Sequence, residues 1–289
     1  MKNIVITGGS GFIGSNLIEY LLKKTNTKII SIDSYYSGLK KNEIKNKRVR
    51  YIKGSTTHIE KYIKGIKVDK LFHFGEFSRI VPSFKFCDIC YRSNLLGTYN
   101  IIKYCSKNKV KLIYSASSSK FGNYGKNENL SPYSWTKSKN IELIKNYAKW
   151  FGLEYRIVYF YNVYGKNQLE NHKLAAVIGI FEYQYINNKP LTVVRPGNHK
   201  RDFTHVSDIV RGSYLASKTK KNCEYMLGTG KNYSVLEVAK MFKHKIKFID
   251  KRPGERFSSK SDTKKSFKEL GYKSKIDIKD YIKDFIKNN

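Results

Sequence analysis

The sequence predicts an α/β protein with a doubly wound parallel sheet. Residues 4–7 form a short apolar run, Ile-Val-Ile-Thr, that leads straight into glycines at positions 8, 11 and 14. A helix is expected next, and a second apolar segment at residues 28–32 ends at Asp33. A strand, a glycine turn, a helix and a second strand in this order form the first unit of such a sheet. The apolar positions of the expected helix are Phe12, Ile13, Leu17, Leu21 and Leu22.

The three glycines have the spacing of a Rossmann-type nucleotide-binding turn. Gly8 permits the tight turn, Gly11 lets the backbone approach a pyrophosphate, and Gly14 lets the helix pack on the strand. The N-terminus of the helix then faces the phosphates. Asp33 would hydrogen-bond the adenosine 2′-hydroxyl and repel a 2′-phosphate, which favours NAD over NADP. A purely structural glycine turn explains less, because it does not account for the acid at the end of the second strand.

Tyr133 and Lys137 lie four residues apart, so they share one face of the helix that contains them. An ammonium beside a phenol favours the tyrosinate form, which can act as a base. Ser117 lies 16 residues upstream of Tyr133, at the end of an apolar run followed by small residues. A chain with 23 Tyr and 56 Lys plus Arg will contain such pairs by chance. Together with the glycine turn, however, the three residues predict a hydride-transfer enzyme.

These motifs resemble those of the extended short-chain dehydrogenase/reductase superfamily, in its nucleotide-sugar epimerase and dehydratase branch. The resemblance runs through nearly the whole chain. It implies a Rossmann-type sheet with a smaller, discontinuous C-terminal lobe that binds the nucleotide-sugar. Further matching segments lie at residues 73–76, 94–98, 117–122, 159–165, 201–208, 252–255 and 267–272.

The resemblance also implies roles for individual residues. Ser117 orients the reacting hydroxyl, Tyr133 takes its proton, and Lys137 holds the nicotinamide ribose. The expected NAD contacts are Gly8, Gly11, Phe12, Ile13, Gly14, Asp33, Phe74, Tyr133 and Lys137.

On the substrate side, the resemblance implies that Asn162 contacts a phosphate or sugar and that Arg201 and Arg252 neutralise the diphosphate. Guanidinium groups suit this role because they form paired hydrogen bonds with phosphate. Seven residues past Arg252, the family places a gatekeeper beside the 2-substituent of the sugar. This position is Ser259, which is small enough to leave room for an N-acetyl group.

The residues after Ser117 bear on the type of reaction. Dehydratases of this family have an Asp-Glu pair directly after the corresponding position, whereas this chain has Ser118 and Ser119. We therefore expect a 4-epimerase that acts on a UDP-hexose, by oxidation at C4 and return of the hydride to the opposite face. The alternatives are another epimerase, dehydratase or reductase of the same family, although a reductase would more often use NADPH, against Asp33.

The expected domains are an NAD-binding domain at residues 1–165, to which 201–216 return, and a nucleotide-sugar lobe at 166–200 and 217–289. The helix that carries Tyr133 is often a dimer surface in this family, so a homodimer is expected. Trp135, Ile141 and Trp150 offer apolar material for it, although burial within one chain would explain them equally well.

The net charge of +33 first suggests a nucleic-acid partner. The lysines are spread along the chain, however, and the abundance of Lys, Asn, Ile, Tyr and Phe fits AT-rich codons. Solvated surfaces therefore explain the charge better. A catalytically idle relative that binds nucleic acid remains the alternative from a different class, and the intact catalytic residues argue against it.

The remaining sequence features exclude several other classes. The four cysteines give no disulfide framework, and the pair Cys87 and Cys90 lacks partners for a metal site, so no metal is expected. No apolar run is long enough to span a membrane and no signal-peptide pattern is present, so we expect a cytoplasmic protein.

Two departures from the family stand out. Ser55 replaces the usual adenine-contacting Asp, and Arg79 replaces a small residue, from where it could touch phosphate or substrate.

Overall fold

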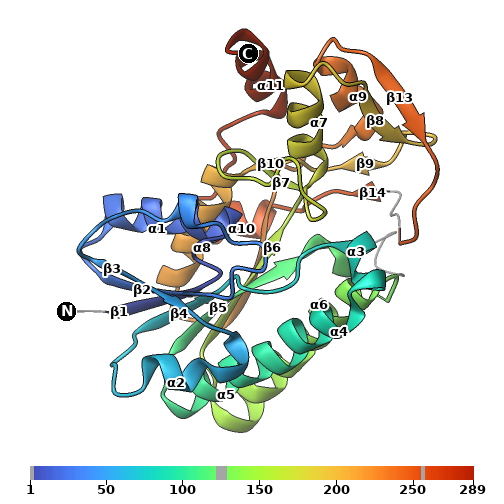
Figure 1. Cartoon of the computed structure of the whole chain (residues 1–289). Coiled ribbons are helices and arrows are strands. Elements are labelled where there is room, and N and C mark those ends of the chain that lie inside the picture. The colour runs from blue at the N-terminus through green and yellow to red at the C-terminus, as the bar shows by residue number, and fades with distance from the viewer. Residues whose placement is uncertain (1–2, 122–128, 255–257) are drawn as a thin grey trace.

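The structure is a computed structural model, which describes residues 3–121, 129–254 and 258–289 (Figure 1). At its centre lies a sheet of seven strands, all paired in parallel, in the order β11-β6-β5-β4-β1-β2-β3. This architecture confirms the predicted fold class. The strands are β1 (Asn3–Thr7), β2 (Lys28–Asp33), β3 (Val49–Lys53), β4 (Lys70–His73), β5 (Lys111–Ser117), β6 (Tyr155–Phe160) and β11 (Cys223–Leu227).

The direction of chain progression reverses between β1 and β4. The strands β2 and β3 follow on one side of β1, whereas β4, β5 and β6 extend the sheet on the other side. In parallel sheets, the loops at such a reversal leave in opposite directions and open a crevice at the carboxyl ends of the strands. The glycine turn after β1 and the segment after β4 therefore lie side by side at this crevice.

Helices cover both faces of the sheet (Figure 1). Alternation along β1 explains the two layers, since Ile4 and Ile6 belong to one apolar core and Val5 belongs to the other. One face carries α1 (Phe12–Lys24), α8 (Val206–Lys218) and α10 (Lys264–Leu270). The other face carries α2 (Ile59–Ile63), α4 (Cys87–Tyr91), α5 (Thr98–Lys107) and α6 (Pro132–Phe151), with α3 (Ile80–Lys85) at its end. Short helical turns lie at Lys40–Asn42, Thr56–His58, Arg92–Gly97 and Ser118–Phe121.

The smaller lobe lies above the carboxyl ends of the strands (Figure 1). Its core is apolar and includes Tyr164, Phe181 and Phe242. Its helices are α7 (Val177–Ile186), α9 (Val235–Met241) and α11 (Ile278–Lys287). Its short strands pair as β7 (Val163–Tyr164) with β10 (Thr204–His205), β8 (Leu191–Val194) with β13 (Ile246–Ile249), and β9 (Lys200–Arg201) with both β12 (Tyr233–Ser234) and β14 (Ser258–Ser259).

The chain returns to the large sheet more extensively than the sequence indicated. Helix α8 packs on the sheet, and it overlaps the expected return at residues 201–216. Strand β11 and helix α10 also belong to this domain, although they lie within the 217–289 range that was assigned to the smaller lobe. The physical reason is that β11 pairs with β6 in parallel register and buries Tyr225 and Leu227 in the core on this face of the sheet.

Candidate active site

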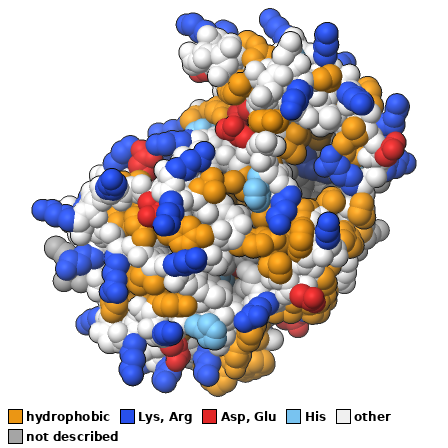
Figure 2. Space-filling model, viewed as in Figure 1, with side chains coloured by type: hydrophobic (Ala, Val, Ile, Leu, Met, Phe, Trp, Pro, Cys, Tyr) orange, Lys and Arg blue, Asp and Glu red, His pale blue; other side chains and the backbone are white. Residues whose placement is uncertain are grey.

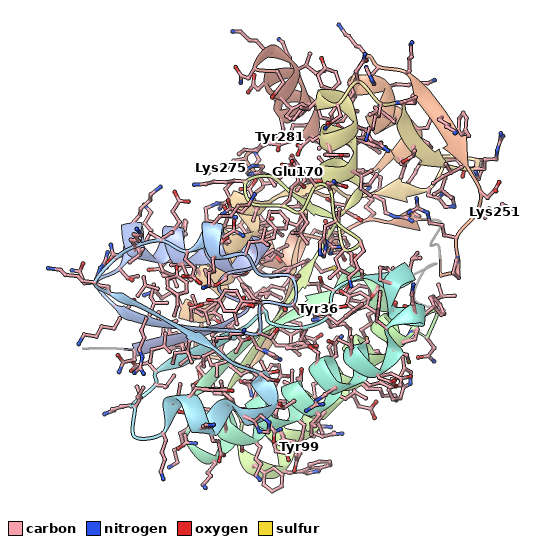
Figure 3. The ribbon with its side chains drawn as sticks, in the orientation of Figure 1. Tyr36, Tyr99, Glu170, Lys251, Lys275 and Tyr281 are labelled. Carbon is pink, nitrogen blue, oxygen red and sulfur yellow. The ribbon has the colours of Figure 1, made fainter. Side chains whose placement is uncertain are left out.

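A cavity of about 870 Å³ lies between the carboxyl ends of the strands and the smaller lobe. Tyr36, which lines it, is labelled in Figure 3 at the junction of the two parts of the molecule. The structure thus brings together residues that are more than 200 positions apart in the chain. The predicted site residues that line the cavity are Gly8, Gly11, Phe12, Ile13, Gly14, Asp33, Phe74, Ser117, Tyr133, Lys137, Asn162, Arg201 and Arg252.

The glycine turn leaves no space for side chains. Gly8 has a φ of +74°, and a Cβ added there would lie 2.8 Å from the Cα of Gly75, in the segment after β4. A Cβ on Gly14 would lie 2.1 Å from the carbonyl oxygen of Gly8. The backbone of this turn therefore lies open to the cavity at the N-terminus of α1, a geometry that fits a dinucleotide pyrophosphate.

Asp33 lies at the carboxyl end of β2 and is 6% exposed. Its carboxylate accepts hydrogen bonds from the backbone N–H groups of Ser10 (3.0 Å) and Tyr35 (2.8 Å). Burial raises the pKa of Asp33, whereas these backbone donors act in the opposite direction. An ionised carboxylate has about four acceptor positions, and the backbone N–H of Gly11 also acts on this one, so acceptor capacity is still left for a hydroxyl of a ribose. The residues present therefore fit NAD.

The cavity wall differs from the family pattern at Ser55, as the sequence indicated. Ser55 lines the cavity, and its hydroxyl accepts a hydrogen bond from the backbone N–H of Thr57 at 3.3 Å. It lies 2.8 Å from the Thr57 hydroxyl. Ser55 thus caps the turn at Thr56–His58 with a neutral group instead of presenting a carboxylate.

Tyr133 lies in the first turn of α6, where the local sequence favours a helix start. Ser131 caps the helix by accepting a hydrogen bond from the N–H of Ser134 at 3.1 Å, and Pro132 occupies the first helical position. The Tyr133 side chain is 9% exposed and packs with Phe77 and Leu174. Lys137 follows one turn later on the same face, as predicted.

Ser117 ends β5, the strand that packs against α6. Its hydroxyl accepts a hydrogen bond from the backbone N–H of Ser119 at 3.1 Å and lines the cavity. Ser118 and Ser119, at the positions of the dehydratase Asp-Glu pair, are both buried.

Lys137 forms an ion pair with Glu76, a residue to which the sequence analysis assigned no role. Both side chains are almost fully buried, at 4% and 1% exposed. The ammonium also donates to the backbone carbonyl of Ser115 at 2.5 Å. The sequence did contain a signal for Glu76. It is an acidic residue three positions after His73, the last residue of the central strand β4, and polar residues at the carboxyl ends of such strands commonly lie in the site.

The substrate side of the cavity is built by the smaller lobe. Asn162 donates a hydrogen bond to the backbone carbonyl of Asp202 at 3.3 Å, beside Arg201, which is 8% exposed. Ser259 is opposite Arg201 in the register of β14 and β9. Arg252 is exposed at the edge of the cavity. The side chain of Ser259 lies outside the described residues, as do positions 122 and 255 of the matching segments.

Arg79 joins the large domain to the smaller lobe. Its Nε donates to the backbone carbonyl of Leu174 at 2.5 Å, and its Nη1 donates to the carbonyl of Ser78 at 2.8 Å. Burial lowers its pKa, and Tyr133 acts in the opposite direction, so its charge lies within range of that phenol. The guanidinium is therefore part of the cavity wall near Tyr133.

The cysteines and the helices bear on two other classes of protein, metalloproteins and membrane proteins. Cys87 is partly exposed and Cys90 is buried, and the described residues contain no group of three or more His, Cys, Asp or Glu side chains arranged to hold a metal. Within the same residues, every helix is too short or too polar to cross a bilayer.

Comparisons with known proteins agree with this geometry. A Methanocaldococcus jannaschii protein provisionally named a UDP-glucose 4-epimerase is 32% identical over 309 residues, covering 99% of each chain. A UDP-N-acetylglucosamine 4-epimerase from Methanobrevibacter ruminantium M1, solved with UDP-N-acetylmuramic acid, superposes with a TM-score of 0.89 at 25% identity, covering 99% of this chain and 97% of that one. A UDP-glucuronic acid 4-epimerase from Bacillus cereus, solved with UDP-glucuronic acid and NAD, gives a TM-score of 0.88 at 26% identity, covering 99% of each chain.

This chain resembles these proteins from end to end. It combines the glycine turn and the acid at the end of β2 with a Ser, a Tyr and a Lys near the carboxyl ends of the strands. The model of the NAD-dependent epimerase/dehydratase family matches residues 4–228, which form most of the chain. The protein belongs to this family.

Proposed function

We propose that this protein is a nucleotide-sugar 4-epimerase that acts on a UDP-hexose. NAD is the cofactor of the family, and when bound it accepts hydride from a carbinol carbon and returns it. The turn at Gly8 to Gly14 holds the pyrophosphate, and Asp33 accepts hydrogen bonds from the adenosine ribose. Tyr133 takes the proton of the sugar hydroxyl, Ser117 orients the same oxygen, and Lys137 favours the tyrosinate.

The observation that carries this proposal is the placement of carboxylates around the cavity. Among the described lining residues, only Asp33 and Glu76 are acidic. Asp33 lies at the adenosine end, and Glu76 is committed to the ion pair with Lys137. Elimination of water needs its own acid and base, and Ser118 and Ser119 supply neither. Epimerisation at C4 needs no group beyond Ser117, Tyr133 and Lys137.

The substrate side supports a diphosphate. Arg201 and Arg252 line the cavity, together with Arg79, Lys173 and His199. We propose that Arg201 and Arg252 neutralise the diphosphate and that Asn162 contacts a phosphate or the sugar. The UDP-sugars named for the relatives above support a uridine nucleotide, and Ser259 favours a substrate with an N-acetyl group at C2.

We further propose that the protein forms a homodimer through α5 and α6. This face exposes three large apolar side chains: Leu96 (49%) in the turn before α5, Tyr99 (40%) on α5 and Trp150 (61%) on α6. Figure 3 shows Tyr99 on the outer side of α5. Trp135 contacts Tyr91 and is only partly buried, whereas Ile141 is 1% exposed and belongs to the core of one chain. We also propose that it works in the cytoplasm.

The distribution of lysines and arginines fits a nucleotide-sugar enzyme better than a nucleic-acid-binding protein. Figure 2 shows them scattered over the visible face of the molecule instead of gathered in one patch. A scattered charge attracts anions in general without defining a groove for a nucleic-acid strand.

The proposal is tested by incubating the protein and NAD with UDP-glucose and, separately, with UDP-N-acetylglucosamine. The anomeric proton of each sugar is followed by NMR. The 4-epimer should form from at least one of them. If neither is converted but NAD binds, the 4-epimerase proposal for these sugars fails and UDP-glucuronic acid is the next substrate to test.

A further inference from the structure

We infer that Glu76 is a positioning residue for the reaction: its buried carboxylate fixes the ammonium of Lys137 and keeps it charged. This inference rests on the proposed function, because it gives Lys137 a role beside Tyr133 and the cofactor.

The hydrogen bonds to Glu76 are divided between its two oxygens. Oε2 faces the ammonium of Lys137. Oε1 accepts from Thr98 (3.0 Å), the Tyr114 hydroxyl (3.1 Å) and the Asn140 amide (3.1 Å). Each of these groups can donate to the carboxylate, and the ammonium can do nothing else. Glu76 is therefore the acceptor of a buried pair, and removing one partner of such a pair leaves the other charge buried without compensation.

A chain of hydrogen bonds ties Glu76 to the glycine turn. Because Thr98 donates its only hydroxyl hydrogen to Glu76, it must accept from Nε2 of His73, which lies 2.9 Å away. Burial lowers the pKa of His73 to about 4, so the ring is neutral and its Nδ1 is an acceptor. The Thr7 hydroxyl, at 2.7 Å, therefore donates to Nδ1. Each hydrogen bond in this chain donates in the direction of Glu76. Together they hold the Glu76 carboxylate in one position.

The ammonium of Lys137 has one N–H group without a hydrogen-bond acceptor among the described residues. Glu76 and the Ser115 carbonyl use two of its three N–H groups, and Lys137 lines the cavity. An ammonium in an apolar site without a counter-charge loses its proton more readily. Glu76 supplies this counter-charge at Lys137.

Three buried titratable side chains close to the pair, Tyr114, Cys90 and His73, are neutral at working pH. Burial raises the pKa of Tyr114, whose ring centroid lies 4.8 Å from the ammonium, and raises the pKa of Cys90 to about 11. His73 is neutral for the reason given above, and Tyr133 is the group that the ammonium serves. Within the described part of the chain, Glu76 is therefore the anion that balances Lys137.

The test is Glu76→Gln. An amide cannot replace the carboxylate, because its nitrogen would face either the ammonium or the three donors on Oε1. We expect turnover to fall by about 100-fold or more, with the loss growing as the pH rises, because Lys137 then loses its charge. NAD should bind about tenfold more weakly, equivalent to about 1.4 kcal/mol, while the KM for the sugar stays nearly unchanged.

The matched control is Glu224→Gln. Glu224 pairs with Lys145, two turns further along the same helix, and accepts from the Tyr159 hydroxyl at 2.5 Å, but it does not line the cavity. This variant should keep its turnover, NAD affinity and pH profile. If Glu76→Gln keeps the NAD affinity of the unmodified protein and loses activity equally at every pH, Glu76 is only a structural residue and the inference fails.

Two further variants separate folding from positioning. If Glu76→Gln does not fold, Glu76→Asp keeps the charge, and it should lower turnover while preserving the pH profile; a loss that grows with pH would contradict the inference. In thermal unfolding, Glu76→Gln and Lys137→Met should each lower the Tm, and the double variant should recover part of the loss. Additive losses would show that the two residues act independently. NAD affinity and Tm decide the role of Glu76 even if no tested sugar is converted, which would contradict only the proposed function.

Discussion

The carboxylate of Asp33 accepts a hydrogen bond from the backbone N–H of Ser10, at a distance of 3.0 Å. This bond ties the end of the second strand to the glycine turn after the first, so the groups proposed to bind the ribose and the pyrophosphate are held in one rigid unit. The carboxylate is buried beside Gly38, where an added Cβ would come within 2.7 Å of it.

Replacing Asp33 should change the choice of cofactor. In Asp33→Ala, the ribose loses a charged acceptor, which is worth about 1.5–3 kcal/mol, so NAD affinity should fall by roughly 10- to 100-fold. NADP should bind no worse than before, since the repulsion of its 2′-phosphate is removed. Calorimetric titration with both cofactors checks this. An unchanged ratio of the two affinities would exclude the contact between Asp33 and the ribose.

Tyr133→Phe should remove turnover and leave NAD binding intact. The substitution deletes only the hydroxyl that takes the proton, and positioned acid–base groups contribute about 10²–10⁴-fold to the rate. The NMR assay for the 4-epimer measures the loss, and calorimetry measures the NAD affinity. A variant with full activity would show that another group takes the proton.

Ser259→Tyr should narrow the range of sugars. We expect UDP-N-acetylglucosamine turnover to fall by at least about tenfold, which is the discrimination that steric exclusion in a pocket commonly gives, while UDP-glucose turnover changes little. Separate kcat/KM values for the two sugars check this. Equal losses for both would show that position 259 does not face the 2-substituent.

Glu182 makes the stability of the smaller lobe dependent on pH. Burial raises its pKa from 4.5 to about 7, although Tyr281 and Gln168 donate hydrogen bonds to it. Because the folded protein holds this proton more tightly than the unfolded chain, stability should fall as pH rises from about 4.5 to about 7, by up to about 3 kcal/mol.

Glu182→Gln should remove this pH dependence and raise the Tm at neutral pH. The new amide can donate to Oε1 of Gln168, a buried atom without a partner among the described residues. Thermal unfolding between pH 4 and 8 checks the prediction. The control is Glu142→Gln, at an exposed residue paired with Lys139, which should leave the dependence in place. If the Tm changes with pH equally in both variants, the pH dependence comes from another group.

The proposed dimer depends on the apolar face of α5 and α6. Tyr99→Glu should convert the protein to a monomer, because it places a charge in the apolar interface. Phe267→Glu is the matched control, since Phe267 is 60% exposed but lies on α10, on the opposite side of the sheet. Sedimentation velocity distinguishes the two states. A monomer in the unmodified protein would contradict the proposal directly.

The sequence by itself determined the fold class, the nucleotide turn and the family. These depend on local patterns: glycines at fixed spacing, an acid at the end of a strand, and a Tyr and a Lys one helical turn apart. Local geometry dictates each of them, so neighbouring residues are enough to recognise them. The same holds for Ser118 and Ser119, whose positions next to Ser117 argue against dehydration.

Only the tertiary structure decided which distant groups meet. Glu76 and Lys137 are 61 positions apart and come together because β4 and β5 are neighbours in the sheet and α6 packs on β5. Likewise, β11 joins the large sheet by pairing with β6 and burying Tyr225 and Leu227, a placement that its own short sequence does not reveal. Long-range pairs of this kind arise from the strand order, and a single sequence carries no local trace of which strands will lie side by side.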